Sequence, residues 1–155
     1  MARLAALLWL FSVSRLLAGE TGVVVSVSPP ATQVGMDILA RGGNAVDAAV
    51  ATGFALAVTW PEAGNIGGGG FMLIRPPGKE SEAVVVDFRA TAPALADKNL
   101  FVRHGRKPYL TVGVPGSVAG MALAHARLGK LPWKSLVEPA VRLADEGFLL
   151  DAGTA

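Results

Sequence analysis

The sequence predicts a mixed α/β fold in which helices cover a β-sheet. Two short apolar runs, Phe71–Ile74 and residues 83–86, lie on either side of a turn rich in proline and glycine, which is typical of a β-hairpin. Residues 44–58 are rich in alanine and apolar on every face, as in a buried helix. Residues 133–146 repeat apolar side chains at helical spacing, which predicts an amphipathic helix.

The composition is that of a globular protein with a large core. The chain has 155 residues, of which 52% are hydrophobic and 17% are charged, so it suits one domain or one part of a larger one. It has no cysteine, which excludes disulfides, thiol catalysis and cysteine metal sites within this chain. Arg3 and Arg15 account for the formal net charge of +2, so the rest is nearly neutral and nothing indicates nucleic-acid binding.

The first 18 residues differ from the rest and resemble a signal peptide. Arg3 precedes an apolar run at residues 4–11, and Ala18-Gly19 is a possible cleavage site. The run is too short to span a membrane, so we expect no stable membrane span. We therefore expect an exported protein, periplasmic or secreted, whose mature part begins near residue 19. An upstream start artefact and an interfacial helix are the alternatives.

The elements before the hairpin follow from β-branched residues and helix caps. Residues 22–28 are rich in valine and precede two prolines, which predicts a first strand. Residues 31–41 predict a helix with Thr32 as its N-cap, stopped by two glycines. Asn44 then caps the buried helix, and Asp47 at the third position completes a capping box.

Two helices are predicted after the hairpin. Residues 90–112 show little periodicity and are predicted to form a loop. A helix follows from a Gly-Val-Pro-Gly-Ser start at residues 113–117 to Leu128, and the last helix spans residues 133–146. Pro139 lies inside the last helix and should bend it.

Four consecutive glycines at positions 67–70 stand between the buried helix and the hairpin. The run lacks the Lys-Ser/Thr of a phosphate loop and precedes a strand, so it is not a nucleotide-binding turn. It is either a tight connection that needs close backbone approach, or a backbone surface that lines a ligand site. The sequence favours neither.

Arg89 follows the second strand of the hairpin and is the candidate binding residue. A guanidinium there can be a surface group, can pair with Asp87, or can clamp a substrate carboxylate through its planar fork. The two histidines, His104 and His125, suggest neither a Ser-His-Asp arrangement nor a metal site. His125 lies on an apolar helix face, which favours a packed, hydrogen-bonded core residue.

Several motifs follow one another along the chain. They are Ala-Thr-Gln-Val-Gly at 31–35, Gly-Gly-Asn-Ala-Val-Asp-Ala-Ala-Val-Ala at 42–51, Gly-Asn-Ile-Gly-Gly-Gly-Gly-Phe-Met at 64–72, Asp-Phe-Arg at 87–89, Gly-Val-Pro-Gly-Ser-Val-Ala-Gly at 113–120, and Pro-Ala-Val-Arg-Leu-Ala-Asp-Glu-Gly-Phe at 139–148. In this order they resemble the amino-terminal part of the large subunit of γ-glutamyltransferases, also called glutathione hydrolases. The resemblance covers about residues 22–151.

The resemblance implies an N-terminal nucleophile hydrolase fold, a four-layer αββα sandwich, of which residues 19–155 would be an incomplete part. It implies a precursor that cleaves itself into a large and a small subunit, whose new first residue, a Thr, is the nucleophile. The enzyme would transfer the γ-glutamyl group of glutathione or related amides to water, amino acids or peptides through an acyl-enzyme. Arg89 would bind the α-carboxylate of that group. No metal or cofactor is implied.

The sequence departs from the family pattern in two ways. Ala90 stands where many members have Glu, which puts pocket contacts in doubt. The chain holds no catalytic residue of the family, because the Thr nucleophile and oxyanion-hole glycines are expected downstream; Thr154 is not in the nucleophile motif. We therefore expect an amino-terminal fragment. The alternatives are a related cephalosporin acylase or poly-γ-glutamate transferase, or a catalytically inert truncated chain.

Overall fold

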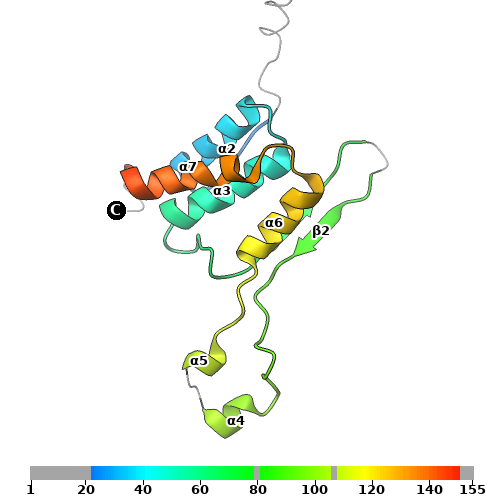
Figure 1. Ribbon diagram of the computed structural model, residues 1–155, viewed down its shortest axis with the longest axis vertical. Helices are drawn as coiled ribbons and strands as arrows, with labels where there is room; N and C mark the ends of the chain where they lie inside the picture. The colour runs from blue at the N-terminus through cyan, green and yellow to red at the C-terminus, as the bar shows by residue number, and fades with distance from the viewer. Residues whose placement is uncertain (1–21, 79–80, 106–107, 151–155) are drawn as a thin grey trace, which may run out of the picture.

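The computed structural model describes residues 22–78, 81–105 and 108–150. Helices α2, α3, α6 and α7 form a body from which a β-hairpin projects on one side, and an arm that carries the short helices α4 and α5 extends away from it (Figure 1). The predicted signal segment, residues 1–18, lies outside the described residues. Within the described part, no helix is both long enough and apolar enough to span a membrane.

Helix α2 (Pro29–Ala40) begins four residues earlier than an N-cap at Thr32 would place it. Ser28 is the N-cap, with extended backbone and a side-chain oxygen that accepts from the Ala31 N–H, so Thr32 lies inside the helix. Two prolines occupy the first turn, where the missing N–H groups cost nothing. The Ser28 hydroxyl also donates to Thr59 Oγ1 at 2.7 Å, which ties this start to the end of α3.

Helix α3 (Ala45–Thr59) is the centre of the body, as its all-round apolar sequence predicts. The predicted capping box is confirmed: Asn44 Oδ1 accepts from the Val46 and Asp47 N–H groups at 3.0 Å, and Asp47 Oδ2 accepts from the Asn44 N–H at 3.0 Å. Helices α2, α6 and α7 all pack against α3. Of its buried polar side chains, Asp47 and Thr59 have hydrogen-bond partners, whereas the Thr52 hydroxyl has none among the described residues.

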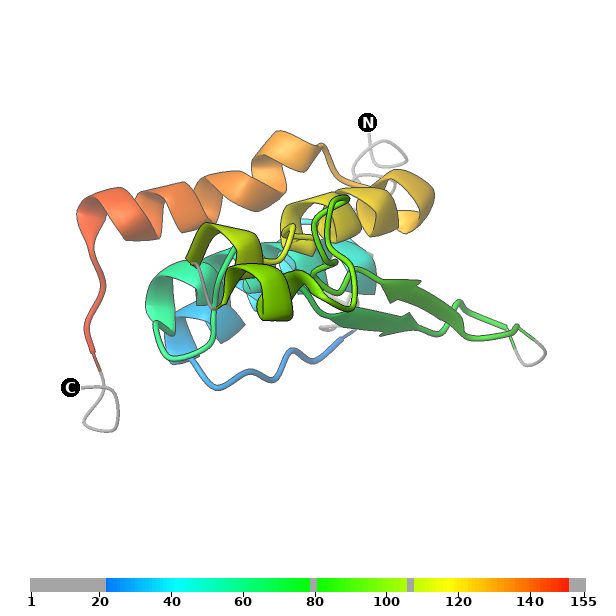
Figure 2. The same ribbon diagram turned by 90° about the horizontal axis from the view of Figure 1, so that it is seen from below.

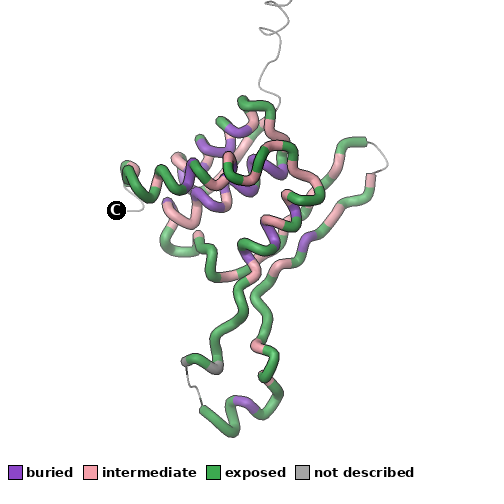
Figure 3. The backbone as a smooth tube through the Cα atoms, viewed as in Figure 1, coloured by how far each residue is buried: buried purple, intermediate pink, exposed green. Residues whose placement is uncertain are grey.

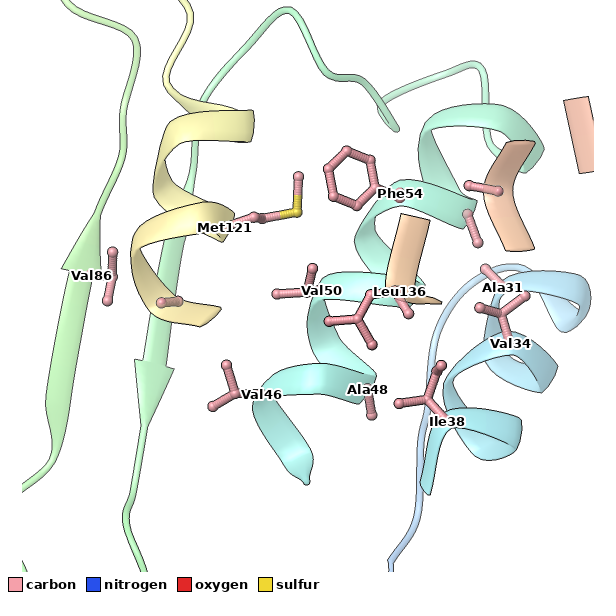
Figure 4. Packing of buried hydrophobic residues seen from close by; sticks show 14 residues of the cluster. Ala31, Val34, Ile38, Val46, Ala48, Val50, Phe54, Val86, Met121 and Leu136 are labelled. Carbon is pink, nitrogen blue, oxygen red and sulfur yellow. The ribbon is translucent and has the colours of Figure 1, made fainter. Parts of the chain in front are cut away.

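Helices α6 (Ser117–Leu128) and α7 (Trp133–Glu146) have the predicted bounds. Leu136 of α7 is fully buried, and Trp133 packs edge-on against Phe54 of α3 with ring centroids 5.5 Å apart. Figure 4 shows the buried side chains that α2, α3, α6, α7 and the hairpin contribute to one cluster. The members labelled there are Ala31, Val34, Ile38, Val46, Ala48, Val50, Phe54, Val86, Met121 and Leu136.

The predicted hairpin is present, with its second strand shifted by one residue. Strands β1 (Phe71–Ile74) and β2 (Val84–Asp87) pair antiparallel, with Phe71 opposite Asp87 and Ile74 opposite Val84. Val86 is buried in the core cluster, whereas Val85 is exposed on the other face. The body therefore covers one face of the hairpin, and most of its length is exposed or half-buried (Figure 3).

Two predictions for the remaining segments are wrong. Residues 22–28 are not a strand: they have no β-partner among the described residues, although Val23 and Val25 are 84% and 87% exposed and alternate with half-buried neighbours. This segment runs on the side of the body opposite α7 (Figure 2). A strand needs a neighbour to hydrogen-bond with, and local sequence does not reveal whether one is present.

The predicted loop at residues 90–112 contains two short helices, α4 (Leu100–His104) and α5 (Pro108–Thr111). Helix α4 is anchored by the buried Leu100 and by an Arg103–Asp97 ion pair of 2.6 Å. The hydrogen bond from Arg103 and one from the Asn99 backbone lower the pKa of Asp97 below its ordinary value. Helices this short carry too few residues to produce a periodic signal.

Candidate substrate-binding site

The site predicted from the sequence lies where the hairpin meets the start of α6. The antiparallel pairing continues one residue beyond β1 and β2: the Phe88 N–H donates to Gly70 O at 3.0 Å, and the Gly70 N–H donates to Phe88 O at 3.4 Å. Three residues beyond Phe88, the Thr91 and Val114 backbones exchange hydrogen bonds of 3.2 and 2.8 Å. Backbone hydrogen bonds at Phe88 and at Thr91 therefore flank Arg89 on both sides along the chain.

The glycine run makes this close approach possible. A Cβ on Gly69 would lie 2.6 Å from Phe88 O and would also collide with the Ala90 backbone nitrogen. The Gly68 carbonyl accepts from the N–H groups of Gly116 and Ser117 at 2.7 and 3.0 Å, at the start of α6. Tight backbone approach is therefore a sufficient reason for these glycines. Whether they also line a ligand site stays a prediction.

Phe88 is the side chain around which the site is assembled. A Cβ on Gly116 would collide with the Phe88 carbonyl oxygen, and a Cβ on Gly120 would collide with Phe88 Cβ. The Phe88 ring is also 3.0 Å from where a Cβ on Gly70 would be. Gly70, Gly116 and Gly120 thus leave space for Phe88. The packing of Phe88 fixes the backbone position of the next residue, Arg89.

Arg89 lies at this point with an exposed side chain. Its backbone N–H donates to Asp87 Oδ1 at 3.0 Å, and its guanidinium carbon lies 5.9 Å from the centre of the Phe71 ring. The described ion pairs join other residues, so the Asp87 carboxylate is not the guanidinium's partner. Among the described residues, no carboxylate forms an ion pair with this guanidinium, so it is available to an anionic ligand.

Neither histidine has a described contact with Arg89. His125 is partly buried: its Nε2 is 2.7 Å from Leu131 O, and its ring lies against Trp133 with centroids 5.3 Å apart. This confirms the packed, hydrogen-bonded role expected of it. His104 is exposed at the end of α4. In the described ranges, no three His, Cys, Asp or Glu side chains gather as a metal site would require.

Asp47 has a second role that the capping box did not predict. It is fully buried, and its carboxylate accepts from the backbone N–H groups of Lys130 and Leu131 at 3.0–3.2 Å. Its Oδ1 lies 3.9 Å from His125 Nε2. A single acidic residue in an otherwise apolar helix is the signal that could have indicated this role.

A small apolar pocket lies behind the glycine run and is separate from the Arg89 side chain. Its volume is about 240 Å³, and its lining includes Gly69, Met72, Phe88, Ser117 and Met121 but not Arg89. The Arg89 side chain is therefore exposed and does not line this pocket.

Comparison with known proteins is consistent with this geometry. A protein-family model described as gamma-glutamyltranspeptidase matches residues 31–155. The glutathione hydrolase proenzyme of Escherichia coli strain K12 is 49% identical over 144 residues, which cover 88% of this chain and 24% of the relative. The chain spans about a quarter of the length of this relative and of the Pseudomonas glutathione hydrolase proenzyme, which it also matches.

Solved structures with the same arrangement include relatives of two kinds. The γ-glutamyltranspeptidase of Helicobacter pylori superposes with a TM-score of 0.75 at 43% identity, covering 84% of this chain and 39% of that one. A cephalosporin acylase from Bacillus halodurans superposes with a TM-score of 0.73 at 32% identity, covering 83% and 24%. The expected N-terminal nucleophile hydrolase scaffold is thus confirmed for this part of the chain. The chain belongs to the gamma-glutamyltranspeptidase family.

Proposed function

We propose that this chain is the amino-terminal part of the large subunit of a γ-glutamyltransferase precursor, and that Arg89 binds the α-carboxylate of the γ-glutamyl donor. The observation that carries the proposal is the exposed Arg89 guanidinium on a turn held by Gly70, Phe88 and Val114. A planar guanidinium can donate two parallel hydrogen bonds to a carboxylate, which fixes both its position and its orientation.

The proposed reaction divides the work between two parts of the precursor. This chain orients the donor through its carboxylate. The amino-terminal Thr of the small subunit attacks the γ-amide carbonyl, the C–N bond breaks, and the amine part of the donor leaves as the acyl-enzyme forms. Water or an amino acid or peptide then accepts the γ-glutamyl group. The substrate we propose is glutathione or another γ-glutamyl amide, and the partner is the small subunit of the same precursor. The proenzyme name of the Escherichia coli relative supports such a precursor.

Export is part of the proposal. The basic residue, apolar run and small residues of the first 18 positions support a cleaved signal peptide and a periplasmic or secreted enzyme.

A second candidate function is an acylase that cleaves another amide. The similarity to the Bacillus halodurans cephalosporin acylase favours it, since a shared scaffold does not decide the substrate. Ala90 follows Arg89, at a position where many members of the family have Glu. A different substrate pocket would be expected at this position first.

The experiment compares two donors on the full-length, self-cleaved protein. One is a γ-glutamyl anilide, and the other is a 4-aminobutanoyl anilide, which has the same reacting amide without the α-carboxylate. We expect a strong preference for the γ-glutamyl donor, and Arg89→Ala should abolish that preference. The loss should be at least roughly 30-fold in kcat/KM, because an unpaired substrate charge costs about 2–5 kcal/mol.

Arg142→Ala is the matched control, since Arg142 is an exposed arginine whose nearest carboxylate is on its own helix. The defect in Arg89→Ala should fall mainly on KM, because the carboxylate is remote from the reacting amide. An unchanged preference in correctly cleaved Arg89→Ala enzyme would remove Arg89 from the site. Faster turnover of a cephalosporin side-chain amide than of the γ-glutamyl anilide would establish the acylase instead.

A further inference from the structure

We infer that Phe71 is a positioning residue that holds the Arg89 guanidinium in place for the donor carboxylate. The inference rests on the proposed function of Arg89 and adds a specificity-determining residue to it. Phe71 begins β1, directly after the glycine run. Its role follows from three properties of the hairpin: the register, the missing side chain at Gly69, and the exposure of the aromatic ring.

The register places Phe71 and Arg89 on the same face of the hairpin. Phe71 pairs with Asp87, and the hydrogen bonds between Gly70 and Phe88 continue that register by one step. Side chains two positions apart on a strand point to the same face, so Asp87 and Arg89 share the face of Phe71. Arg89 is thus the diagonal neighbour of Phe71, at a separation that long and aromatic side chains bridge.

Gly69 leaves that face open beside Arg89. A regular continuation of the register would put Gly69 opposite Arg89, and glycine offers no side chain to contact it. The nearest ring on this face is that of Phe71, whose centre is 5.9 Å from the guanidinium carbon. That distance is within the range of a cation–π attraction, which favours a guanidinium over the ring face.

Among the described residues, Phe71 lies outside the hydrophobic core cluster. The residue is 60% exposed, whereas Val86 on the opposite face of the hairpin is buried in the core. The interaction described for the Phe71 ring is therefore the one with Arg89. Because Asp87 accepts the Arg89 backbone N–H, the backbone is fixed by one neighbour and the side chain by the other.

The proposal predicts a coupling between Phe71 and Arg89 in donor binding. In the full-length, self-cleaved protein, Phe71→Leu should raise KM for the γ-glutamyl anilide about two- to five-fold and leave kcat nearly unchanged, because a partly exposed cation–π contact is weak. Phe71→Tyr keeps the ring and should behave like the wild type. Phe71→Leu in the Arg89→Ala background should lower kcat/KM no further.

Phe101→Leu is the matched control, since Phe101 is a similarly exposed phenylalanine on the arm helix α4. Phe71→Met, which also removes the ring, replaces Phe71→Leu if that precursor does not cleave itself. The inference is overturned if Arg89→Ala raises KM while Phe71→Leu and Phe71→Met do not. It is equally overturned if the loss at Phe71 is the same with and without Arg89. An unchanged KM in Arg89→Ala would instead contradict the proposed function itself.

Discussion

At the scale of single residues, the candidate site depends on glycines, whose lack of a Cβ atom lets neighbouring groups approach closely. The space for Phe88 exists because Gly116, the N-cap of α6, and Gly120, within α6, have no Cβ. The backbone of residues 88–90 can approach Gly69 for the same reason. Phe88 in turn fixes Arg89, which carries the proposed binding function. Glycines on a helix normally weaken it, so their presence here indicates a packing requirement.

Replacement of Gly120 by alanine tests this packing requirement. The new Cβ would collide with Cβ and Cγ of Phe88, atoms next to a backbone that is fixed by hydrogen bonds to Gly70. We expect overpacking of about 1–3 kcal/mol to exceed a helix-propensity gain of about 1 kcal/mol, so Gly120→Ala should lower the unfolding temperature.

The control is Gly53→Ala in α3, where a Cβ would meet only the Met121 sulfur, at 3.0 Å. A methionine side chain can move aside, so this variant should unfold near the wild-type temperature. Thermal unfolding of both full-length variants measures the difference. A Gly120→Ala protein that is as stable as Gly53→Ala would show that the contact with Phe88 is easily relieved.

At the scale of elements, Asp47 connects the start of α3 to the turn between α6 and α7. Its buried carboxylate accepts hydrogen bonds from the backbone N–H groups of Asn44, Lys130 and Leu131. Lys130 and Leu131 are 83 and 84 residues away from it in the sequence. Asn44 strengthens the same junction, because its side-chain nitrogen donates to Leu128 O at 2.6 Å. One Asn-x-x-Asp motif therefore both caps a helix and positions two others.

Substitution of Asp47 should destabilise the protein more than the loss of an ordinary cap. Asp47→Ala leaves the partly buried N–H groups of Asn44, Lys130 and Leu131 without this acceptor, and we expect a loss of at least about 2 kcal/mol in the free energy of unfolding. Asp47→Asn should rescue little, because its amide NH₂ would face backbone donors. Urea unfolding of the full-length protein measures the effect.

Asp37→Ala is the control, since Asp37 is an exposed residue of α2 that pairs only with Gln33 on the same helix among the described contacts. It should change stability by less than about 0.5 kcal/mol. Equal effects at positions 37 and 47 would show that the Asp47 hydrogen bonds contribute little.

The elements that the sequence predicted well are those whose signal is local. Helix α7 has the predicted bounds because its apolar spacing and the glycine that follows it are complete within the segment. The predicted strand at residues 22–28 was wrong because β-structure depends on a neighbour. Arg89 could be identified as a candidate, whereas its contact with Phe71 could not, because it requires the strand register.

At the scale of the whole molecule, the described chain has an apolar surface that its own elements do not cover. Part of it lies on residues 22–28 and on the open face of the hairpin, and further exposed apolar residues lie on the arm that carries α4 and α5. In the first two places, the exposed large apolar residues are Val23, Val25, Val27, Phe71, Leu73 and Val85. Further strands would satisfy the free backbone edges, and a second layer packed on the open faces would cover these side chains.

The last prediction concerns a polypeptide of residues 19–155 alone. Uncovered apolar surface and open strand edges favour association, so we expect this polypeptide to aggregate or to unfold without a sharp, reversible thermal transition. It should also turn over no γ-glutamyl anilide, because the nucleophile and oxyanion hole of the proposed mechanism are supplied by the small subunit. Size-exclusion chromatography, calorimetry and an anilide assay measure these properties, with the full-length, self-cleaved protein as the control. A monomeric elution profile with cooperative unfolding would contradict the first expectation, and turnover by the isolated polypeptide would contradict the division of catalytic work.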